Sequence, residues 1–370
     1  MNNPFIITGY QSADLFCDRK NEIELLKSAA IDSKHNTLFS IRRMGKTGLM
    51  QHLQSVLEAE NIKVIYFDIM MTNSVNDFVE QFSRAFFKQA YSTTQKTLQK
   101  ASEILKNIVP SMTADPITGE FKLSLTLSSQ KDNYEDIENI IEYIKSSNSK
   151  FLIMIDEFQQ ITNYKSSGLE QFLRSKIQFL NNCAFIFSGS KKHLLLSMFG
   201  EHTGPFWQFS AFMELKPINQ DTYYTFVSEQ FMKNNQRISL EAFDYIYIKM
   251  QGITYFVQSV CHELYNSNIK NINQNNVVDT ITELVAQKEN YYVNLWHLLT
   301  QKQKDMLSAI SLNNGIDKPL SNSFLTEYKL GAASTISSVL EALIDKELVY
   351  YENKLYRLTD PLMEEWLRNV

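Results

Sequence analysis

Short apolar runs alternate with helical periodicities through the first 210 or so residues. The runs that have the length and apolar content of buried strands lie at 37–41, 64–69, 151–155 and 184–187. Apolar residues spaced three and four apart predict helices at 21–30, 47–60, 75–108 and 134–146. Strands that alternate with helices form a parallel sheet whose two faces are covered. The pattern therefore predicts an α/β fold with a doubly wound parallel sheet.

The pattern of the remaining chain is different. Two β-rich stretches on either side of Pro116 and Gly119, the second at 121–127, predict an inserted hairpin. From 219 to about 288 the periodicity is helical only. The last 75 or so residues predict three helices and then a strand pair, 348–351 and 354–358, joined by a two-residue turn at Glu352-Asn353. Three helices followed by a β-wing are typical of a winged helix.

Composition excludes several classes of protein. The chain has 370 residues, of which 44% are hydrophobic and 21% charged, so it has ample material for two or three packed domains and is not disordered. The net charge of -5 gives no general attraction for nucleic acid. The three cysteines are widely spaced, which disfavours a zinc site and a disulfide framework. Without a membrane-spanning run or a leader pattern, we expect a cytoplasmic protein that has no membrane contact.

Residues 40–47, SIRRMGKT, match the phosphate-binding pattern GxxxxGK[ST] except that Ser40 occupies the first glycine position. This chemistry needs backbone N–H groups at a helix N-terminus, an ammonium for the outer phosphates and a hydroxyl for Mg²⁺, which Gly45, Lys46 and Thr47 supply. An ordinary surface turn is the alternative interpretation. The position of the match between a predicted strand and a predicted helix favours a nucleotide site.

A second acidic element supports this interpretation. The apolar run from 151 ends in Asp156 and Glu157. In enzymes with such a loop, the first acid holds Mg²⁺ through water and the second orients and deprotonates the attacking water. The alternative is a pair of acids that complement the dipole of the following helix. Another run ends near Ser190, our candidate for sensing the γ-phosphate, although a turn with a helix cap is an equally good interpretation.

Several motifs resemble those of a known family, the prokaryotic AAA+ ATPases related to the STAND class, which have a C-terminal winged helix. They are the segment 16–23 (FCDRKNEI), the loop 42–47 (RRMGKT), the strand end 187–190 (FSGS), the link 214–218 (ELKPI) and the final segment from 356 to Trp366. The resemblance covers nearly the whole chain. It implies an ATPase core at 1–216, a helical lid at 217–290 and a winged helix at 291–370.

The resemblance also implies the ligands and the residues that hold them. ATP and Mg²⁺ are the implied cofactors, and the reaction is hydrolysis of ATP to ADP and phosphate. The residues that it places around the nucleotide are Arg42, Arg43, Met44, Gly45, Lys46, Thr47 and Gly48 in the loop and Arg19 near the adenine. Thr47 and Asp156 would hold the metal, and Glu157, Lys46 and Ser190 would act in catalysis.

Some residues depart from the family pattern. Asp18 and Ser40 replace glycines, and Thr254 stands where the lid often has proline. Phe209 ends a stretch that often ends in arginine, and a phenyl ring cannot neutralise transition-state charge. We therefore expect slow hydrolysis. Arg42 and Arg43 are alternative cations for this role, although solvated loop cations are the simpler interpretation.

The charge of the winged helix bears on its partner. From 296 to 370 eight Lys and Arg residues stand against ten Asp and Glu, whereas a DNA-binding module usually carries clustered positive charge. The expected recognition helix, 332–346, offers hydroxyls at Ser334, Thr335, Ser337 and Ser338 but also acids at Glu341 and Asp345.

Three functions therefore compete. The first is an ATP-dependent molecular switch whose nucleotide state acts on the winged helix and an unidentified protein partner. The second is an ATP-regulated DNA-binding protein similar to replication initiators, and the third a scaffold that binds nucleotide without hydrolysing it. Family members can assemble, so an oligomer is compatible with all three.

Overall fold

The computed structural model describes residues 3–91, 108–114, 121–127, 134–165 and 168–369. It divides into two compact units, which we treat separately. The sheet unit comprises Arg19–Ser40 and Lys46–Leu215. The C-terminal unit comprises Met1–Asp18, Lys216–Val370 and, from the middle of the sequence, Ile41–Gly45. None of the described helices combines the length and the apolar character that crossing a membrane would need.

The sheet unit is built on five parallel strands in the order β2-β5-β6-β1-β7. They are β1 (Asn36–Phe39), β2 (Lys63–Asp68), β5 (Phe151–Asp156), β6 (Cys183–Gly189) and β7 (Ala211–Glu214). Every residue of β1, β5 and β6 is buried, as expected for inner strands covered on both faces. The four strands predicted from apolar runs are confirmed, and β7 adds an edge.

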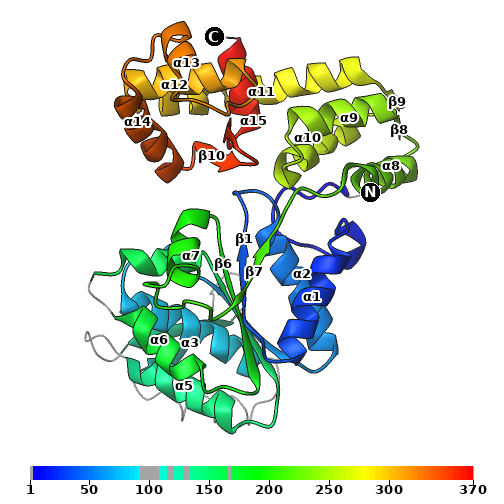
Figure 1. Cartoon of the computed structure of the whole chain (residues 1–370). Helices are drawn as coiled ribbons and strands as arrows, with labels where there is room; N and C mark the ends of the chain where they lie inside the picture. Colours follow the sequence, from blue (N-terminus) through cyan, green and yellow to red (C-terminus); the bar gives the residue numbers. More distant parts are fainter. Residues whose placement is uncertain (1–2, 92–107, 115–120, 128–133, 166–167, 370) are drawn as a thin grey trace. The chain divides into compact units, whose positions relative to one another are not determined.

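Helices cover both faces of this sheet. The helices of the unit are α1 (Lys20–Ile31), α2 (Lys46–Ala59), α3 (Val75–Tyr91), α5 (Tyr134–Ser146), α6 (Leu169–Ile177) and α7 (Lys192–Phe199). Figure 1 shows α1 and α2 on one face and the others on the opposite face. A core rich in phenylalanine joins α3, α5, α6 and α7 to the sheet. The doubly wound fold predicted from the pattern is confirmed.

An antiparallel hairpin interrupts the alternation of strands and helices. It consists of β3 (Ile108–Ala114) and β4 (Phe121–Leu127), in a register that pairs Ile108 with Leu127. The predicted hairpin is confirmed. The predicted helix 75–108 was wrong at its end, because β3 already begins at Ile108; residues 92–107 lie outside the described part of the chain. The β-branched Ile108 and Val109 favour a strand.

Most of the expected lid region is helical. Its helices are α8 (Gln220–Lys233), α9 (Leu240–Lys249), α10 (Thr254–Asn266) and α11 (Gln274–His297). The prediction of helix alone was incomplete, since β8 (Arg237–Ile238) and β9 (Asn271–Ile272) form a short parallel pair. The long helix α11 runs across position 290, so the expected division of the C-terminal unit at that position stays a prediction.

The final segment has the predicted winged-helix elements. They are α12 (Gln301–Leu312), α13 (Asn322–Glu327), α14 (Ala333–Asp345), the wing strands β10 (Val349–Glu352) and β11 (Leu355–Leu358), and α15 (Pro361–Arg368). The predicted turn at Glu352-Asn353 was one residue early. Glu352 pairs with Leu355, and the turn residues are Asn353 and Lys354, both at positive φ (51° and 66°). A two-residue hairpin turn of type I′ needs this conformation at both positions.

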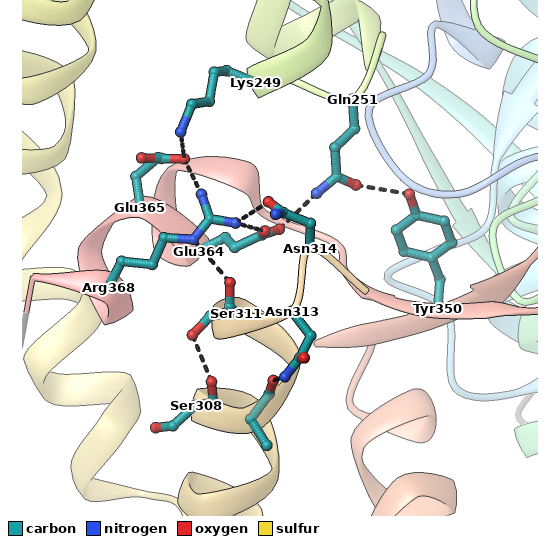
Figure 2. Close-up of polar contacts among 11 residues, drawn as sticks. Lys249, Gln251, Ser308, Ser311, Asn313, Asn314, Tyr350, Glu364, Glu365 and Arg368 are labelled. Atoms are coloured by element: carbon teal, nitrogen blue, oxygen red, sulfur yellow. Dashed lines mark hydrogen bonds and ion pairs between the residues drawn. The ribbon is translucent and has the colours of Figure 1, made fainter. Parts of the chain in front are cut away.

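Within the C-terminal unit, polar contacts join α9 to the winged helix (Figure 2). Lys249 pairs with Glu365 at 2.8 Å, and the Gln251 carboxamide donates to Glu364 at 2.7 Å. The Tyr350 hydroxyl of the wing donates to the oxygen of Gln251 at 2.8 Å. Glu364 is buried, and a buried carboxylate that loses its partners leaves an uncompensated charge. These contacts join the end of α9 to α15 and the wing within the C-terminal unit.

Candidate functional site

The loop after β1 places Lys46 at the first position of α2. Its side chain is buried, and the ammonium donates to the backbone oxygen of Ser40 at 3.0 Å and to the Ser40 hydroxyl at 3.2 Å. Ser40 does not adopt a positive φ, whereas Gly45 has φ 101°. The loop therefore needs a glycine at position 45 and accepts a serine at position 40. The ammonium lies beside Ser40, at the start of the loop. The loop ends at the N-terminus of α2, and a helix N-terminus is a place where anions bind.

Residues 41–45 of this loop pack within the C-terminal unit. The Thr254 hydroxyl donates to the Met44 carbonyl at 3.0 Å, and the Tyr255 N–H donates to the Arg43 carbonyl at 3.0 Å. Thr254 also lies beside Gly45, since a Cβ added to Gly45 would be 3.9 Å from the Thr254 side chain, an ordinary contact distance. The start of α10 thus holds the backbone of the loop. Thr254 is the residue that departs from the family's lid pattern, and its hydroxyl makes a contact that proline could not make.

Both loop arginines form ion pairs with the winged helix. Arg42 pairs with Glu347 at 2.6 Å and Arg43 with Asp360 at 3.0 Å. The Arg43 guanidinium also lies 5.0 Å from the ring centres of Tyr255 and Phe256, a cation–π distance. Both side chains are exposed, 44% for Arg42 and 40% for Arg43, as expected of solvated loop cations, and the ion pairs are an addition that the expectation lacked. Their partners lie more than 300 positions away in the sequence, which no local pattern reveals.

Thr47 and Asp156 meet at the carboxyl edge of the sheet. The Thr47 hydroxyl donates to Asp156 Oδ2 at 2.9 Å, and the Tyr66 hydroxyl donates to the same oxygen at 3.3 Å. Asp156 is only 2% exposed. Burial, and then the charge of Asp156, raises the pKa of Tyr66, which therefore stays a protonated donor. A hydroxyl and a carboxylate at this separation form an oxygen pair on which a small hard cation can bind.

Glu157 follows directly in an unusual backbone conformation. Its φ of 54° is in the left-handed region, which a non-glycine residue enters only when its surroundings impose it. Its N–H donates to Asp156 Oδ1 at 3.0 Å. Its own carboxylate accepts, through Oε2, from the Ser190 hydroxyl at 3.1 Å and from Gln159 Nε2 at 2.5 Å. The structure thus brings Glu157 and Ser190 together as neighbours.

Asp68 is a member of this group that the sequence analysis missed. It ends β2 and is the register partner of Asp156. Desolvation raises the pKa of Asp68, and the negative charges of Asp156 and Glu157 raise it further. A hydrogen bond from the Met70 N–H acts in the opposite direction and lowers it. The signal was available, because an apolar strand that ends in an acid was also what identified Asp156.

The residues present fit a magnesium ion that is bound together with a nucleotide. Among the described side chains, no three His, Cys, Asp or Glu residues form a metal-binding group. Mg²⁺ seldom needs one, because it keeps several waters and uses one or two protein oxygens beside substrate phosphates. The Thr47 hydroxyl and the Asp156 carboxylate are such a pair.

Asp18 and Arg19 lie in the segment that the resemblance placed near the adenine. Both have positive φ, 56° and 68°. Asp18 therefore adopts the conformation that glycine adopts most readily, which explains the glycine of the family pattern. Arg19 is buried, and its guanidinium pairs with Glu22 at 3.0 Å.

Phe209 stands at the position where the family often has arginine. Its ring lies 4.5 Å from the His35 ring, and the Arg174 guanidinium lies 4.3 Å from its centre. His35 directly precedes β1 and therefore marks the amino edge of the sheet, opposite the edge where Asp156 ends β5. Phe209 thus has a packing role there.

Comparison with known proteins agrees with this fold. Residues 16–260 match the family described as the ATPase domain predominantly from Archaea, and residues 290–369 match a probable winged helix domain. A Walker-type ATPase of Pyrococcus abyssi is similar over 99% of this chain and 99% of that chain, with a TM-score of 0.68 and 17% identity. The ORC2 protein of Aeropyrum pernix, solved in ADPNP–ADP complexes, is similar over 100% of this chain and 97% of that chain, with a TM-score of 0.57 and 14% identity.

No curated protein matches the chain. At these identities the solved structures establish the fold, and the family assignment comes from the match over residues 16–260. The chain therefore belongs to the family of ATPase domains found predominantly in Archaea, with a P-loop NTPase fold and a C-terminal winged helix.

Proposed function

We propose that the protein binds Mg-ATP, hydrolyses it slowly and couples its nucleotide state to the winged helix. The observation that carries the proposal is the contact of Thr47 with Asp156 at 2.9 Å, with Glu157 next in the chain. Two segments more than 100 residues apart thus bring a hydroxyl and two carboxylates to the edge of the sheet where doubly wound folds bind ligands.

Each residue has a role that its chemistry supports. The Lys46 ammonium and the backbone amides of residues 44–48 would bind the phosphates, and Thr47 and Asp156 would hold Mg²⁺. The metal would neutralise charge on the phosphate oxygens. Glu157 would accept the proton of the attacking water. Ser190 would donate its hydroxyl proton to the γ-phosphate in place of Glu157, and Gln159 would then remain the side-chain donor to Glu157 Oε2. Water adds to the γ-phosphorus, the bond to the ADP oxygen breaks, and ADP leaves with its negative charge.

Coupling to the winged helix is supported by the loop arginines. Arg42 and Arg43 are paired with the carboxylates of Glu347 and Asp360. Phosphate oxygens are anionic acceptors that arginine also binds. Phosphates and these two carboxylates would therefore compete for the same guanidinium groups, which would link the nucleotide state to the winged helix.

Slow turnover is supported by the same contacts. Both loop arginines are engaged by acids, which leaves them less able to neutralise charge on the phosphates. A missing arginine finger costs several orders of magnitude in rate, roughly 10³–10⁵-fold.

Phosphate release measured on the parent chain and on Glu157→Gln tests the hydrolysis. The substitution should leave ATP affinity unchanged and reduce turnover by about a hundredfold or more, because it removes the proton acceptor. Equal turnover in the two proteins would exclude Glu157 as the base. ATP binding without phosphate release in the parent chain would support the scaffold instead.

DNA binding is the second candidate, favoured by the exposed hydroxyls of Ser334, Thr335 and Ser338 on α14. The net negative charge of the segment opposes it. A gel-shift experiment with duplex DNA tests this function. Retarded migration with the parent chain, lost in a Ser337→Ala, Ser338→Ala double variant, would favour DNA binding over the switch.

A further inference from the structure

We propose that Gln159 is a positioning residue that holds the Glu157 carboxylate for catalysis. The inference rests on the proposed role of Glu157 and adds a residue that neither the sequence motifs nor the family resemblance singled out. Gln159 Nε2 donates to Glu157 Oε2 at 2.5 Å, and the Ser190 hydroxyl donates to the same oxygen at 3.1 Å. Both donors come from within the sheet unit.

Both donors bond the same oxygen of the Glu157 carboxylate, so the other oxygen remains for the attacking water. Oε2 accepts from Gln159 and Ser190, whereas Oε1 of Glu157 accepts no hydrogen bond from the described residues. A general base needs one oxygen directed at the water whose proton it accepts, and a fixed second oxygen sets that direction. The Gln159 carboxamide does not ionise near neutral pH and cannot serve as a general acid or base, so its contribution is orientation.

The Gln159 side chain is itself held in place. It is 5% exposed and belongs to the short 3₁₀ helix Phe158–Asn163, which begins directly after Glu157. The neighbouring Phe158 is fully buried, and its ring lies 4.6 Å from that of Phe187 on β6. An anchored backbone and a buried amide give the hydrogen bond to Glu157 little freedom to shift.

A glycine on the adjacent strand provides the space for this amide. A Cβ added to Gly189 would lie 1.9 Å from Gln159 Oε1, far inside contact distance. Gly189 does not have a positive φ, so its backbone would accept another residue, and the need for glycine comes mainly from Gln159, with Leu195 Cδ1 farther away at 3.1 Å. Gln159 Oε1 is buried and accepts no hydrogen bond in the described chain. Because such an orphaned acceptor costs stability, the carboxamide has a reason other than stability to be there.

Turnover and affinity of Gln159→Leu, compared with Glu157→Gln and the parent chain, test the proposal. Leucine has a similar size and removes the orphaned acceptor, so the fold should be kept. We expect kcat to fall roughly 10- to 100-fold, as for a catalytic group displaced by about 1 Å, with unchanged affinity for ATP. Gln160→Leu, the next residue in the chain, is the matched control, because the Gln160 carboxamide donates to the Thr72 carbonyl and not to Glu157. This control should keep the parent kcat.

A second measurement needs no nucleotide. Gly189→Ala should lower the unfolding midpoint by roughly 2–4 °C or more through its clash with Gln159. The same substitution should cost clearly less in a Gln159→Ala background. Equal costs in the two backgrounds would overturn the proposed packing of Gln159 against Gly189.

The outcomes separate the inference from the function on which it rests. Full kcat in Gln159→Leu beside an inactive Glu157→Gln overturns the positioning role alone. Full kcat in Glu157→Gln overturns the assignment of the base and, with it, this inference. A lower ATP affinity of Gln159→Leu with unchanged kcat would contradict orientation of the base and show a binding role.

Discussion

Protonation of His35 should lower the stability of the sheet unit. Its Nδ1 accepts from the Phe185 N–H at 3.2 Å, which requires the neutral ring. Burial, and then the nearby charge of Arg174, lowers the pKa of His35 from 6.5 to about 4. The folded protein therefore binds fewer protons than the unfolded chain between these values. Stability is complete above about pH 6.5 and falls as the pH drops toward 4, by at most about 3 kcal/mol.

The unfolding midpoint of the parent chain and of His35→Gln, measured at about pH 7.5 and about pH 5.0, checks this linkage. The parent should lose more stability than the variant over this range, because only the parent contains the ring that is protonated on unfolding. Parallel losses in both proteins would mean that other groups cause the acid sensitivity.

Not all residues of the candidate site could be predicted from the sequence. Lys46, Thr47, Asp156 and Glu157 belong to local patterns, a loop motif and an apolar strand that ends in acids. Gln159 has no such pattern, because its importance depends on the space above a glycine of another strand. A contact of this kind exists only after the sheet has formed.

Among the elements, the wing shows where sequence patterns lose precision. Its two strands were predicted, but the turn was placed one residue early, since a polar Glu352 looks like a turn residue and nevertheless pairs with Leu355. The positive φ of Lys354 cannot be inferred from a residue type that rarely adopts it. The helices α1, α2 and α5 were predicted to within one residue at each end because their apolar stripes are regular.

The same turn leads to a prediction about stability. Lys354→Gly should stabilise the winged helix by about 0.5–1 kcal/mol, because glycine adopts the required positive φ without strain. The unfolding midpoint of the full chain should rise accordingly. Lys346→Gly, at the αR position that ends α14, is the matched control and should give no increase. A lower midpoint for Lys354→Gly would contradict the type I′ turn.

For the whole molecule, the central feature is the segment 41–45, which precedes Lys46 in the chain and packs within the C-terminal unit. Asp360 joins three features of that unit. It caps α15, accepts from the Tyr292 hydroxyl at 3.2 Å and pairs with Arg43. This connection could not be predicted from the sequence, because the paired residues are 317 positions apart.

If the carboxylate competes with phosphate for Arg43, Asp360→Asn should bind ATP more tightly than the parent chain. Asparagine caps helices as well as aspartate does, so α15 should keep its start. The gain in ATP affinity should be at most about fivefold, because a partly exposed ion pair contributes about 1 kcal/mol. The gain should become smaller as salt is added, since salt screens the pair. Glu341→Gln removes the same charge from an exposed position on α14 and should have no effect. Weaker binding by Asp360→Asn would show that the pair supports nucleotide binding instead.

The most direct test of the account is the equilibrium affinity for Mg-ATP of the parent chain and of Lys46→Ala. The fold of the variant should be verified by its unfolding midpoint, and Lys34→Ala, which alters a lysine with a largely exposed side chain, is the control. Loss of a charged hydrogen-bond donor to the phosphates should weaken binding by roughly 10- to 100-fold in Lys46→Ala and leave Lys34→Ala unchanged. A folded Lys46→Ala protein that binds Mg-ATP as tightly as the parent chain would contradict the proposed site.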